Sequence, residues 1–233
     1  MIKGTFWKRD PVWERLDIAA RKQTAGFELA SVGQVFRTPE ILEVTTHGIR
    51  MEEFKSIVPM RRFLSGLKTE AMADALFRVG AALGTIHSNL QIPGWHSTMP
   101  WTDGRESMTP IHGDFGLRNV HFDFDQGVVA ILDWSTPAWL EAWYTHGPPS
   151  WDLALFMVDM MYMWPLEPNY IKHASIGRAA FHAGYTTIRP LPGDLSSMLR
   201  HVARLYLRSS ATDGTIRALR MPSMVRTFVT GAP

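Results

Sequence analysis

The chain has 233 residues, of which 45% are hydrophobic and 20% are charged. This composition is typical of globular proteins and excludes a largely disordered chain, and the length suits one large domain or two small lobes. Because the chain contains no cysteine, disulfides, thiolate metal sites and a cysteine nucleophile are excluded, and we expect a cytoplasmic protein. The net charge of +2 is too small to indicate nucleic-acid binding, and no apolar run is long enough for a membrane span.

The first 54 residues are expected to form a small lobe that combines strands with one helix. Its expected elements are a strand over residues 2–8, a helix over 11–30 and a hairpin with strands over 41–46 and 49–54. Asp10 and Pro11 favour the start of the helix, because aspartate caps a first turn and proline fits its first position. His47 and Gly48 favour a two-residue turn, since glycine tolerates a positive φ.

Residues 55–233 are expected to form a larger lobe that is mostly helical. Apolar residues recur at steps of four and three along its strongest helical segment, at Met72, Leu76, Val79, Leu83 and Ile86. A second apolar helix is expected to begin at Asp152 and to end near Pro165. The two parts, 1–54 and 55–233, together predict an α+β fold with two lobes.

Positive charge gathers toward the end of the chain, where six arginines and one acid follow Leu195. Arg200, Arg204 and Arg208 are four residues apart, so they are expected to share one face of a helix. A solvated helix face is the simpler interpretation. A contact for an anionic substrate or an acidic surface is the alternative.

A short polar segment near the middle of the chain gives the strongest indication of chemistry. It gathers His112, Asp114 and Asn119, and an apolar hairpin then leads to Asp133. Asn119 and Asp133 lie seven positions either side of Gln126, so a hairpin that turns there would place them side by side. Carboxylate and amide oxygens are ligands that suit Mg²⁺ when phosphate oxygens complete its shell. We therefore expect Asn119 and Asp133 to bind Mg²⁺.

Asp114 is the candidate catalytic base. It lies five residues before Asn119 in a glycine-containing loop, where it is suited to accept the proton of a hydroxyl that attacks a γ-phosphate. Phosphoryl transfer depends mainly on positioning and on neutralisation of charge, so one base and two metal ligands are a sufficient core. His112 is expected to pack and to hydrogen-bond so that it fixes this loop.

The central motifs resemble those of a known family. The order His-Gly-Asp-x₄-Asn over residues 112–119, followed by Ile-Leu-Asp-Trp over 131–134, is similar to the signature of the aminoglycoside phosphotransferase/choline kinase-like family. Pro-Ser-Trp-Asp-Leu-Ala over 149–154 resembles a downstream element of that family, whose aspartate, here Asp152, braces the catalytic loop. The resemblance implies a protein-kinase-like fold. It also implies Mg²⁺-dependent transfer of the γ-phosphate of ATP or GTP to a hydroxyl of a small molecule or sugar.

The resemblance extends more loosely to the small lobe. It implies that Lys8 contacts the nucleotide phosphates and that Glu28 on the following helix holds this lysine, with Lys3 and Glu14 as substitutes. The hinge residues that would meet the nucleotide base are Met51, Glu52, Glu53 and Phe54. Family members carry two strands and a glycine-rich phosphate loop before the lysine. Only seven residues precede Lys8, so a shortened lobe without that loop is expected.

Two other functions remain open. A catalytically silent binding or regulatory protein would be consistent with the missing glycine-rich loop. A metallophosphoesterase could use Asp114, but it needs a second cluster of His and Asp ligands downstream, and the sequence shows none.

The acceptor is also open, between an amino sugar, another sugar, a choline-like amine and a lipid-linked glycan, while the basic C-terminal segment favours an anionic compound. Four tryptophans after the second metal candidate suggest core packing or, alternatively, sugar stacking: Trp134, Trp139, Trp143 and Trp151. Glu141, the one acid among them, could meet a cationic acceptor. The expected partners are therefore a nucleotide and a small acceptor.

Overall fold

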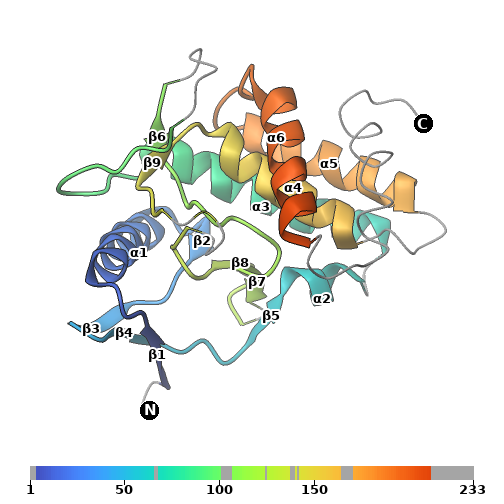
Figure 1. Cartoon of the computed structure of the whole chain (residues 1–233). Helices are drawn as coiled ribbons and strands as arrows, with labels where there is room; N and C mark the ends of the chain where they lie inside the picture. The colour runs from blue at the N-terminus through green and yellow to red at the C-terminus, as the bar shows by residue number, and fades with distance from the viewer. Residues whose placement is uncertain are drawn as a thin grey trace.

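The computed structural model of the chain describes residues 4–65, 68–100, 107–123, 125–136, 140, 142–163 and 170–210. A strand-rich part around the first helix lies on one side of the molecule, and a helical part lies on the other (Figure 1). Within the described ranges, no helix has both the length and the apolar character that crossing a membrane requires.

The predicted elements are present, with bounds shifted by a few residues. The N-terminal elements are β1 (Thr5–Arg9), α1 (Trp13–Gly33), β2 (Phe36–Arg37), β3 (Ile41–Thr45) and β4 (Gly48–Glu52). The elements that follow are β5 (Ile57–Pro59), α2 (Met60–Ser65), α3 (Thr69–Asn89), β6 (Thr109–Pro110), β7 (Val120–Asp123), β8 (Val128–Ile131), β9 (His146–Gly147), α4 (Ser150–Met163), α5 (Tyr170–Thr186) and α6 (Leu195–Ser210). The predicted α+β class is confirmed.

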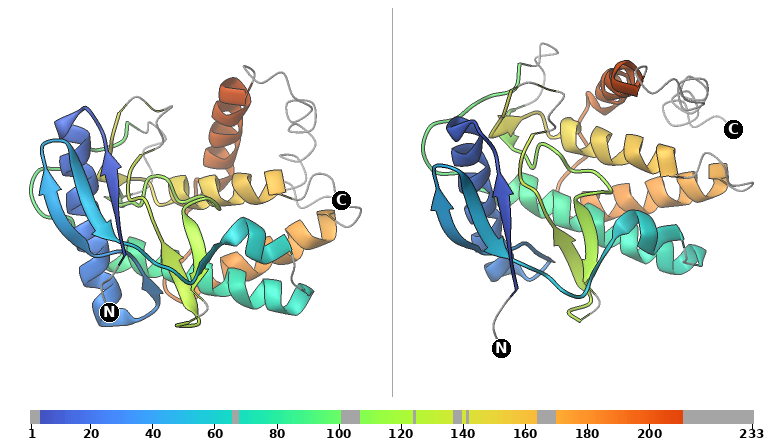
Figure 2. Two further views of the ribbon diagram at one scale, coloured as in Figure 1. Left: turned by 90° about the horizontal axis from the view of Figure 1, so that it is seen from below. Right: turned by 60° about the horizontal axis from the view of Figure 1, so that its bottom comes forward.

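A three-stranded antiparallel sheet with the order β1-β4-β3 forms the strand-rich part. The helix α1 lies along this sheet (Figure 2). Leu16 and Ala19 of α1 pack against Ile49 and Met51 of β4 in a small buried cluster. Burial of these apolar side chains fixes the helix on the sheet.

The hairpin between β3 and β4 turns at Thr46 and His47, one residue earlier than the sequence suggested. Gly48 is the first residue of β4 and is not among the glycines with positive φ. A Cβ atom at this position would lie 2.7 Å from the carbonyl oxygen of Lys8 in β1. The close approach of β1, and not the turn, therefore explains this glycine.

A second sheet, with the order β2-β8-β7-β5, connects the two parts of the molecule. The strand β2 follows α1 directly and pairs in parallel with β8, while β5 pairs with β7. Both strands escaped the sequence analysis, because two or three residues are too few to show the alternation of a strand. They hold the β7–β8 hairpin between the strand-rich part and the helical part.

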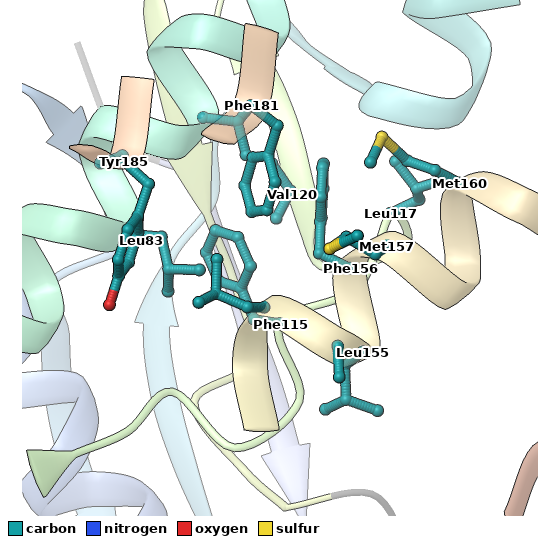
Figure 3. Close-up of a cluster of buried hydrophobic side chains, with 14 of the residues drawn as sticks. Leu83, Phe115, Leu117, Val120, Leu155, Phe156, Met157, Met160, Phe181 and Tyr185 are labelled. Atoms are coloured by element: carbon teal, nitrogen blue, oxygen red, sulfur yellow. The ribbon is translucent and has the colours of Figure 1, made fainter. Parts of the chain in front are cut away.

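The main core lies between this hairpin and the helices. Phe115, Val120, Phe156 and Phe181 gather in its centre (Figure 3). The predicted apolar stripe of α3 is confirmed, since all five of its residues are at most 2% exposed. Near the end of the described chain, α6 buries Met198 against this core.

The basic face predicted near the C-terminus falls partly on α6. Arg200 and Arg204 are exposed on this helix, in agreement with a solvated helix face. The side chain of Arg208, and the arginines at 217, 220 and 226, lie outside the described residues.

Candidate active site

The β7–β8 hairpin carries Asn119 and Asp133 at its open end. The backbone N–H of Leu132 donates to the carbonyl oxygen of Asn119 at 2.8 Å, so Asn119 lies opposite Leu132. The hairpin therefore brings Asn119 and Asp133 to the same end, as the sequence predicted, with Asp133 one residue beyond the position opposite Asn119. Asp133 adopts a φ of 55°, which non-glycine residues rarely adopt and which is frequent at functional sites.

Asp114 lies beside both of these residues. The side-chain amide of Asn119 donates to the carbonyl oxygen and to Oδ2 of Asp114, each at 2.9 Å. Nη2 of Arg118 donates to both carboxylate oxygens of Asp114, at 2.9 and 2.6 Å. Burial raises the pKa of Asp114, and the charge of Asp133 adds to this effect, while Arg118 and Asn119 oppose it. A carboxyl group with a raised pKa is a more effective proton acceptor than an ordinary surface aspartate.

His112 is held in one tautomer by its neighbours. The backbone N–H of Asp114 donates to Nδ1 at 3.2 Å, and Nε2 lies 3.1 Å from the carbonyl oxygen of Leu132. The proton is therefore assigned to Nε2. Burial lowers the pKa of His112 to about 4. The imidazole is thus neutral at physiological pH and serves as a rigid connection within the loop.

Asp152, in the first turn of α4, holds the backbone of the same loop. Its carboxylate accepts hydrogen bonds from the N–H groups of His112 at 2.7 Å and Gly113 at 2.8 Å. Nε2 of His87, from α3, lies 3.2 Å from Oδ2. Burial alone would raise the pKa of Asp152, but His87, His112 and Lys22 lower it below the usual value. The buried carboxylate therefore stays ionised and keeps the two amides in place.

Lys22 is the functional candidate that the sequence analysis missed. It is fully buried on α1, and its Nζ donates to the carbonyl oxygens of His112 at 2.6 Å and Tyr144 at 3.1 Å. Burial lowers its pKa to about 8, while Asp152 opposes this effect. A lysine is seldom fully buried, and nothing in its local sequence marks it, because the contacts come from residues at least 90 positions away.

Gly113 permits this approach of Lys22 to the loop. Its φ is 88°, and a Cβ atom there would lie 3.0 Å from Nζ of Lys22. The glycine therefore answers two requirements at once, a left-handed backbone and room for the buried ammonium group.

Lys8 forms an ion pair with Asp133. Its Nζ also lies 5.5 Å from the centre of the Trp143 ring. Burial alone would raise the pKa of Asp133, but Lys8 more than offsets this, with help from Ser135, and the pKa is lowered. The β1 strand thus delivers a cation to the second metal candidate.

The oxygens of Asn119 and Asp133 fit a hard cation. The amide of Asn119 directs Nδ2 at Asp114, which leaves Oδ1 without a hydrogen bond among the described residues. In Asp133, Oδ1 accepts from Lys8 and from Ser135 at 2.7 Å, and Oδ2 has no such partner in the described ranges. No group of three or more acidic, His or Cys side chains there could hold a metal alone. Two protein oxygens completed by phosphate oxygens are typical of Mg²⁺.

The predicted pairing of Lys8 with Glu28 is wrong. Glu28 is exposed on α1 and forms no ion pair within the described part of the chain. At 100° per residue, Glu28 lies far round the helix from Lys22, which faces the site. The substitute Glu14 is also exposed, and Lys3 lies outside the described residues.

The expected hinge residues are placed at the end of β4. Met51 is buried against α1, and its backbone lies in β4, the central strand, opposite Phe6 of β1 and Ile41 of β3. The N–H of Glu52 donates to Glu40, and the N–H of Glu53 donates to the carbonyl oxygen of Gly4 at 2.8 Å. Both backbone donors are therefore used within the protein.

The tryptophans near the site differ in their surroundings. Trp134 and Trp151 are each 1% exposed, and their Nε1 atoms donate at 2.8 Å to Thr38 and to the carbonyl oxygen of Gly113. Core packing therefore explains both residues. Trp143 is only partly buried and lies beside Lys8, while Trp139 and Glu141 lie outside the described residues.

Comparisons with known proteins identify the fold. No protein-family model matches the sequence, and neither does any curated protein. Solved structures do match. The aminoglycoside phosphotransferase APH(3'')-Id from Streptomyces rimosus, in complex with ADP and streptomycin, has a TM-score of 0.56 and 15% identity, covering 86% of each chain.

Two further structures agree with this match. A choline/ethanolamine kinase family protein from Mesorhizobium loti has a TM-score of 0.57 and 14% identity, over 96% of this chain and 83% of its own. A glucosamine kinase in complex with glucosamine, ADP and inorganic phosphate has a TM-score of 0.61 and 12% identity, over 79% of this chain and 64% of its own. Likenesses at these identities establish the fold, which is protein-kinase-like as the motifs implied.

Proposed function

We propose that the protein is a Mg²⁺-dependent phosphotransferase that moves the γ-phosphate of ATP or GTP to a hydroxyl group of a small molecule. The observation that carries this proposal is the meeting of a buried base, Asp114, with two oxygen-bearing side chains, Asn119 and Asp133, at one end of a hairpin. The fold supports it, since solved proteins of this fold bind ADP. Residues 1–54 would form the nucleotide lobe, and 55–233 the catalytic lobe.

In this proposal each residue of the site has a separate role in an in-line transfer of the phosphoryl group. Asp114 takes the hydroxyl proton as the acceptor oxygen forms a bond to the γ-phosphorus, and the bond from that phosphorus to the bridging oxygen breaks. The nucleoside diphosphate leaves with the electron pair of that bond. Asn119 and Asp133 would hold Mg²⁺, whose charge neutralises the phosphates. Lys8, already beside Asp133, adds a second cation for the phosphate oxygens.

The nucleotide base would enter along the hinge. Because the N–H groups of Glu52 and Glu53 are occupied, we propose that Met51, Glu52 and Glu53 offer mainly their remaining backbone groups. The base would then form fewer hydrogen bonds, so more of the binding free energy of the nucleotide would come from its phosphates and the metal.

A catalytically silent binding or regulatory protein is the second candidate, because the 233 residues contain no glycine-rich phosphate loop. Buried carboxylates without a function are costly, but here each has partners, so their persistence alone does not decide the question. The two candidates differ in turnover.

The deciding experiment measures ADP or GDP formation with Mg²⁺ and a panel of hydroxyl compounds, for the wild type and for Asp114→Asn. We expect acceptor-dependent turnover in the wild type and a loss of at least about 100-fold in the variant, since general-base catalysis contributes that much. Nucleotide binding without acceptor-dependent turnover would instead favour the silent protein.

A further inference from the structure

Arg118 covers the carboxylate of Asp114, the proposed catalytic base. Its Nη2 bridges both carboxylate oxygens of Asp114, and Asn119 takes part of Oδ2. A carboxylate that is covered in this way has little room for a substrate hydroxyl. A general base has to lie within hydrogen-bond reach of the hydroxyl, so we expect the guanidinium to withdraw when the acceptor binds directly to Asp114.

The guanidinium is able to move. The side chain of Arg118 is 60% exposed, while that of Asp114 is 7% exposed, so the cation and not the carboxylate is free to leave. Nη1 and Nε have no hydrogen bond among the described residues. Because the guanidinium is exposed, solvent screens part of its attraction to Asp114, and the hydroxyl of a bound acceptor would replace the lost hydrogen bond to Asp114.

The surroundings of Arg118 indicate where the guanidinium would bind instead. Lys8 and Asp133, where the nucleotide phosphates are proposed to lie, form an ion pair with each other. Arg118 is instead adjacent in the chain to Leu117, whose N–H donates to Asp159 of α4, a residue that also accepts from Tyr206 of α6. This is the helical side, which is left for the acceptor.

The acidic group on that side, Asp159, already accepts hydrogen bonds from other residues. Asp159 accepts hydrogen bonds from the hydroxyl of Tyr206 at 2.7 Å and from the N–H of Leu117 at 3.0 Å. Burial raises its pKa, while Tyr206, Leu117 and Arg118 lower it. Each oxygen of Asp159 therefore already accepts a hydrogen bond, which makes this carboxylate a weaker site for the displaced Arg118 than an anionic group of the acceptor.

We propose that Arg118 selects an anionic acceptor, in which a carboxylate or phosphate group draws the guanidinium away from Asp114 and the hydroxyl of the same molecule takes its place. This inference rests on the proposed phosphotransfer. An acceptor with an ammonium group near its hydroxyl would meet a like charge at this position, whereas Arg forms paired hydrogen bonds with carboxylate and phosphate. Arg118 is thus a specificity-determining residue.

The test compares acceptors that share a carbon skeleton and differ in the charged group that they carry. The hexose set is glucose, glucosamine, glucuronate and glucose 6-phosphate, and the three-carbon set is glycerol, glycerate and glycerol 3-phosphate. The kcat/KM for Mg²⁺-nucleotide turnover is measured for the wild type, Arg118→Gln and Arg118→Lys. Because Arg118 contacts the base, the informative quantity is the ratio of kcat/KM for the anionic and neutral members, in which a general loss of base function cancels.

We expect this ratio to exceed about 10 in the wild type and to fall about 10- to 100-fold in Arg118→Gln, as the loss of a charged hydrogen bond predicts. Arg118→Lys should retain part of the preference, because it keeps the charge without the paired donors. A ratio near one in the wild type, or an unchanged ratio in Arg118→Gln, would overturn the inference. So would binding of Mg²⁺-nucleotide without turnover of any anionic member. A protein that fails to bind Mg²⁺-nucleotide would refute the proposed function itself.

Discussion

Lys22 shows at a single residue how the cost of burying a charge opposes the gain from the contacts that the charge makes in the site. Its ammonium group is removed from water, which costs free energy, yet it neutralises nearby carboxylates and holds two carbonyl oxygens. The cost appears as the lowered pKa, about 8 instead of 10.5. Between these two pH values the unfolded chain binds more protons than the folded chain, so this residue makes the free energy of unfolding rise with pH.

This linkage predicts a difference between the wild type and Lys22→Met. From about pH 8 to about pH 10, the free energy of unfolding of the wild type should rise relative to that of the variant, by up to about 3 kcal/mol over the full interval. Below pH 8 Lys22 is charged in both the folded and the unfolded wild type. The difference in the free energy of unfolding between wild type and variant should therefore be constant there. Denaturant unfolding at a series of pH values measures it. A difference that is independent of pH throughout would contradict the buried, charged lysine.

At the scale of secondary-structure elements, the close contact between α3 and α5 determines how these two helices pack in the helical part. A Cβ atom on Gly80 would overlap the carbonyl oxygen of Phe181, and one on Gly184 would overlap that of Phe77. Two backbones can approach so closely only where both helices lack side chains. His87, one of the supports of Asp152, lies on the same α3, so the packing of these helices is connected to the site.

Gly80→Ala should therefore destabilise the protein. Alanine favours a helix over glycine by about 1 kcal/mol, but an overlap with backbone atoms that cannot rotate away costs about 1–3 kcal/mol or more. Gly33→Ala is the matched control, because a Cβ atom there meets only Val35, at 3.9 Å. We expect a lower melting temperature for Gly80→Ala and an unchanged or slightly higher one for Gly33→Ala. Equal effects of the two substitutions would show that the close contact is unimportant.

Elements with a strong periodic pattern were predictable from the sequence. The stripe along α3 results from burial of one face, and the apolar run of β8 results from burial of nearly the whole strand, so the amino acids themselves record both. The strands β2 and β5 are too short to show a period, and the α3–α5 contact depends on glycines that have no local signature. The sequence predicted that Asn119 and Asp133 lie at the same end of the β7–β8 hairpin, but their offset by one residue depends on the turn, which is less certain than a strand.

At the scale of the whole molecule, the site joins segments that are distant in the sequence. Asp114, Asn119 and Asp133 were predictable together, because a single hairpin connects them. Lys22 comes from α1, and the partner of Lys8 proved to be Asp133 in place of Glu28. Such contacts depend on how α1 is rotated on its sheet, which the sequence does not specify locally. Tertiary packing decides them.

The fold therefore places the candidate site between the strand-rich part, which supplies Lys8 and Lys22, and the helical part, which supplies Asp152 and its supports. This arrangement makes a strong prediction about binding. The charges of Lys8 and Asp133 neutralise each other in the present state, so a metal-bound phosphate has to engage both. Loss of Asp133 should remove the metal and leave Lys8 alone with the phosphates.

The most direct test is a calorimetric titration of ATP and of GTP, with and without Mg²⁺, into the wild type, Asp133→Ala and Asp125→Ala. Asp125 is an exposed residue at the turn of the same hairpin and serves as the control. We predict Mg²⁺-dependent binding of at least one nucleotide in the wild type and in Asp125→Ala, and loss of the Mg²⁺ dependence in Asp133→Ala. An Mg²⁺-nucleotide affinity that is unchanged in Asp133→Ala, or absent in the wild type for both nucleotides, would contradict the phosphotransferase site.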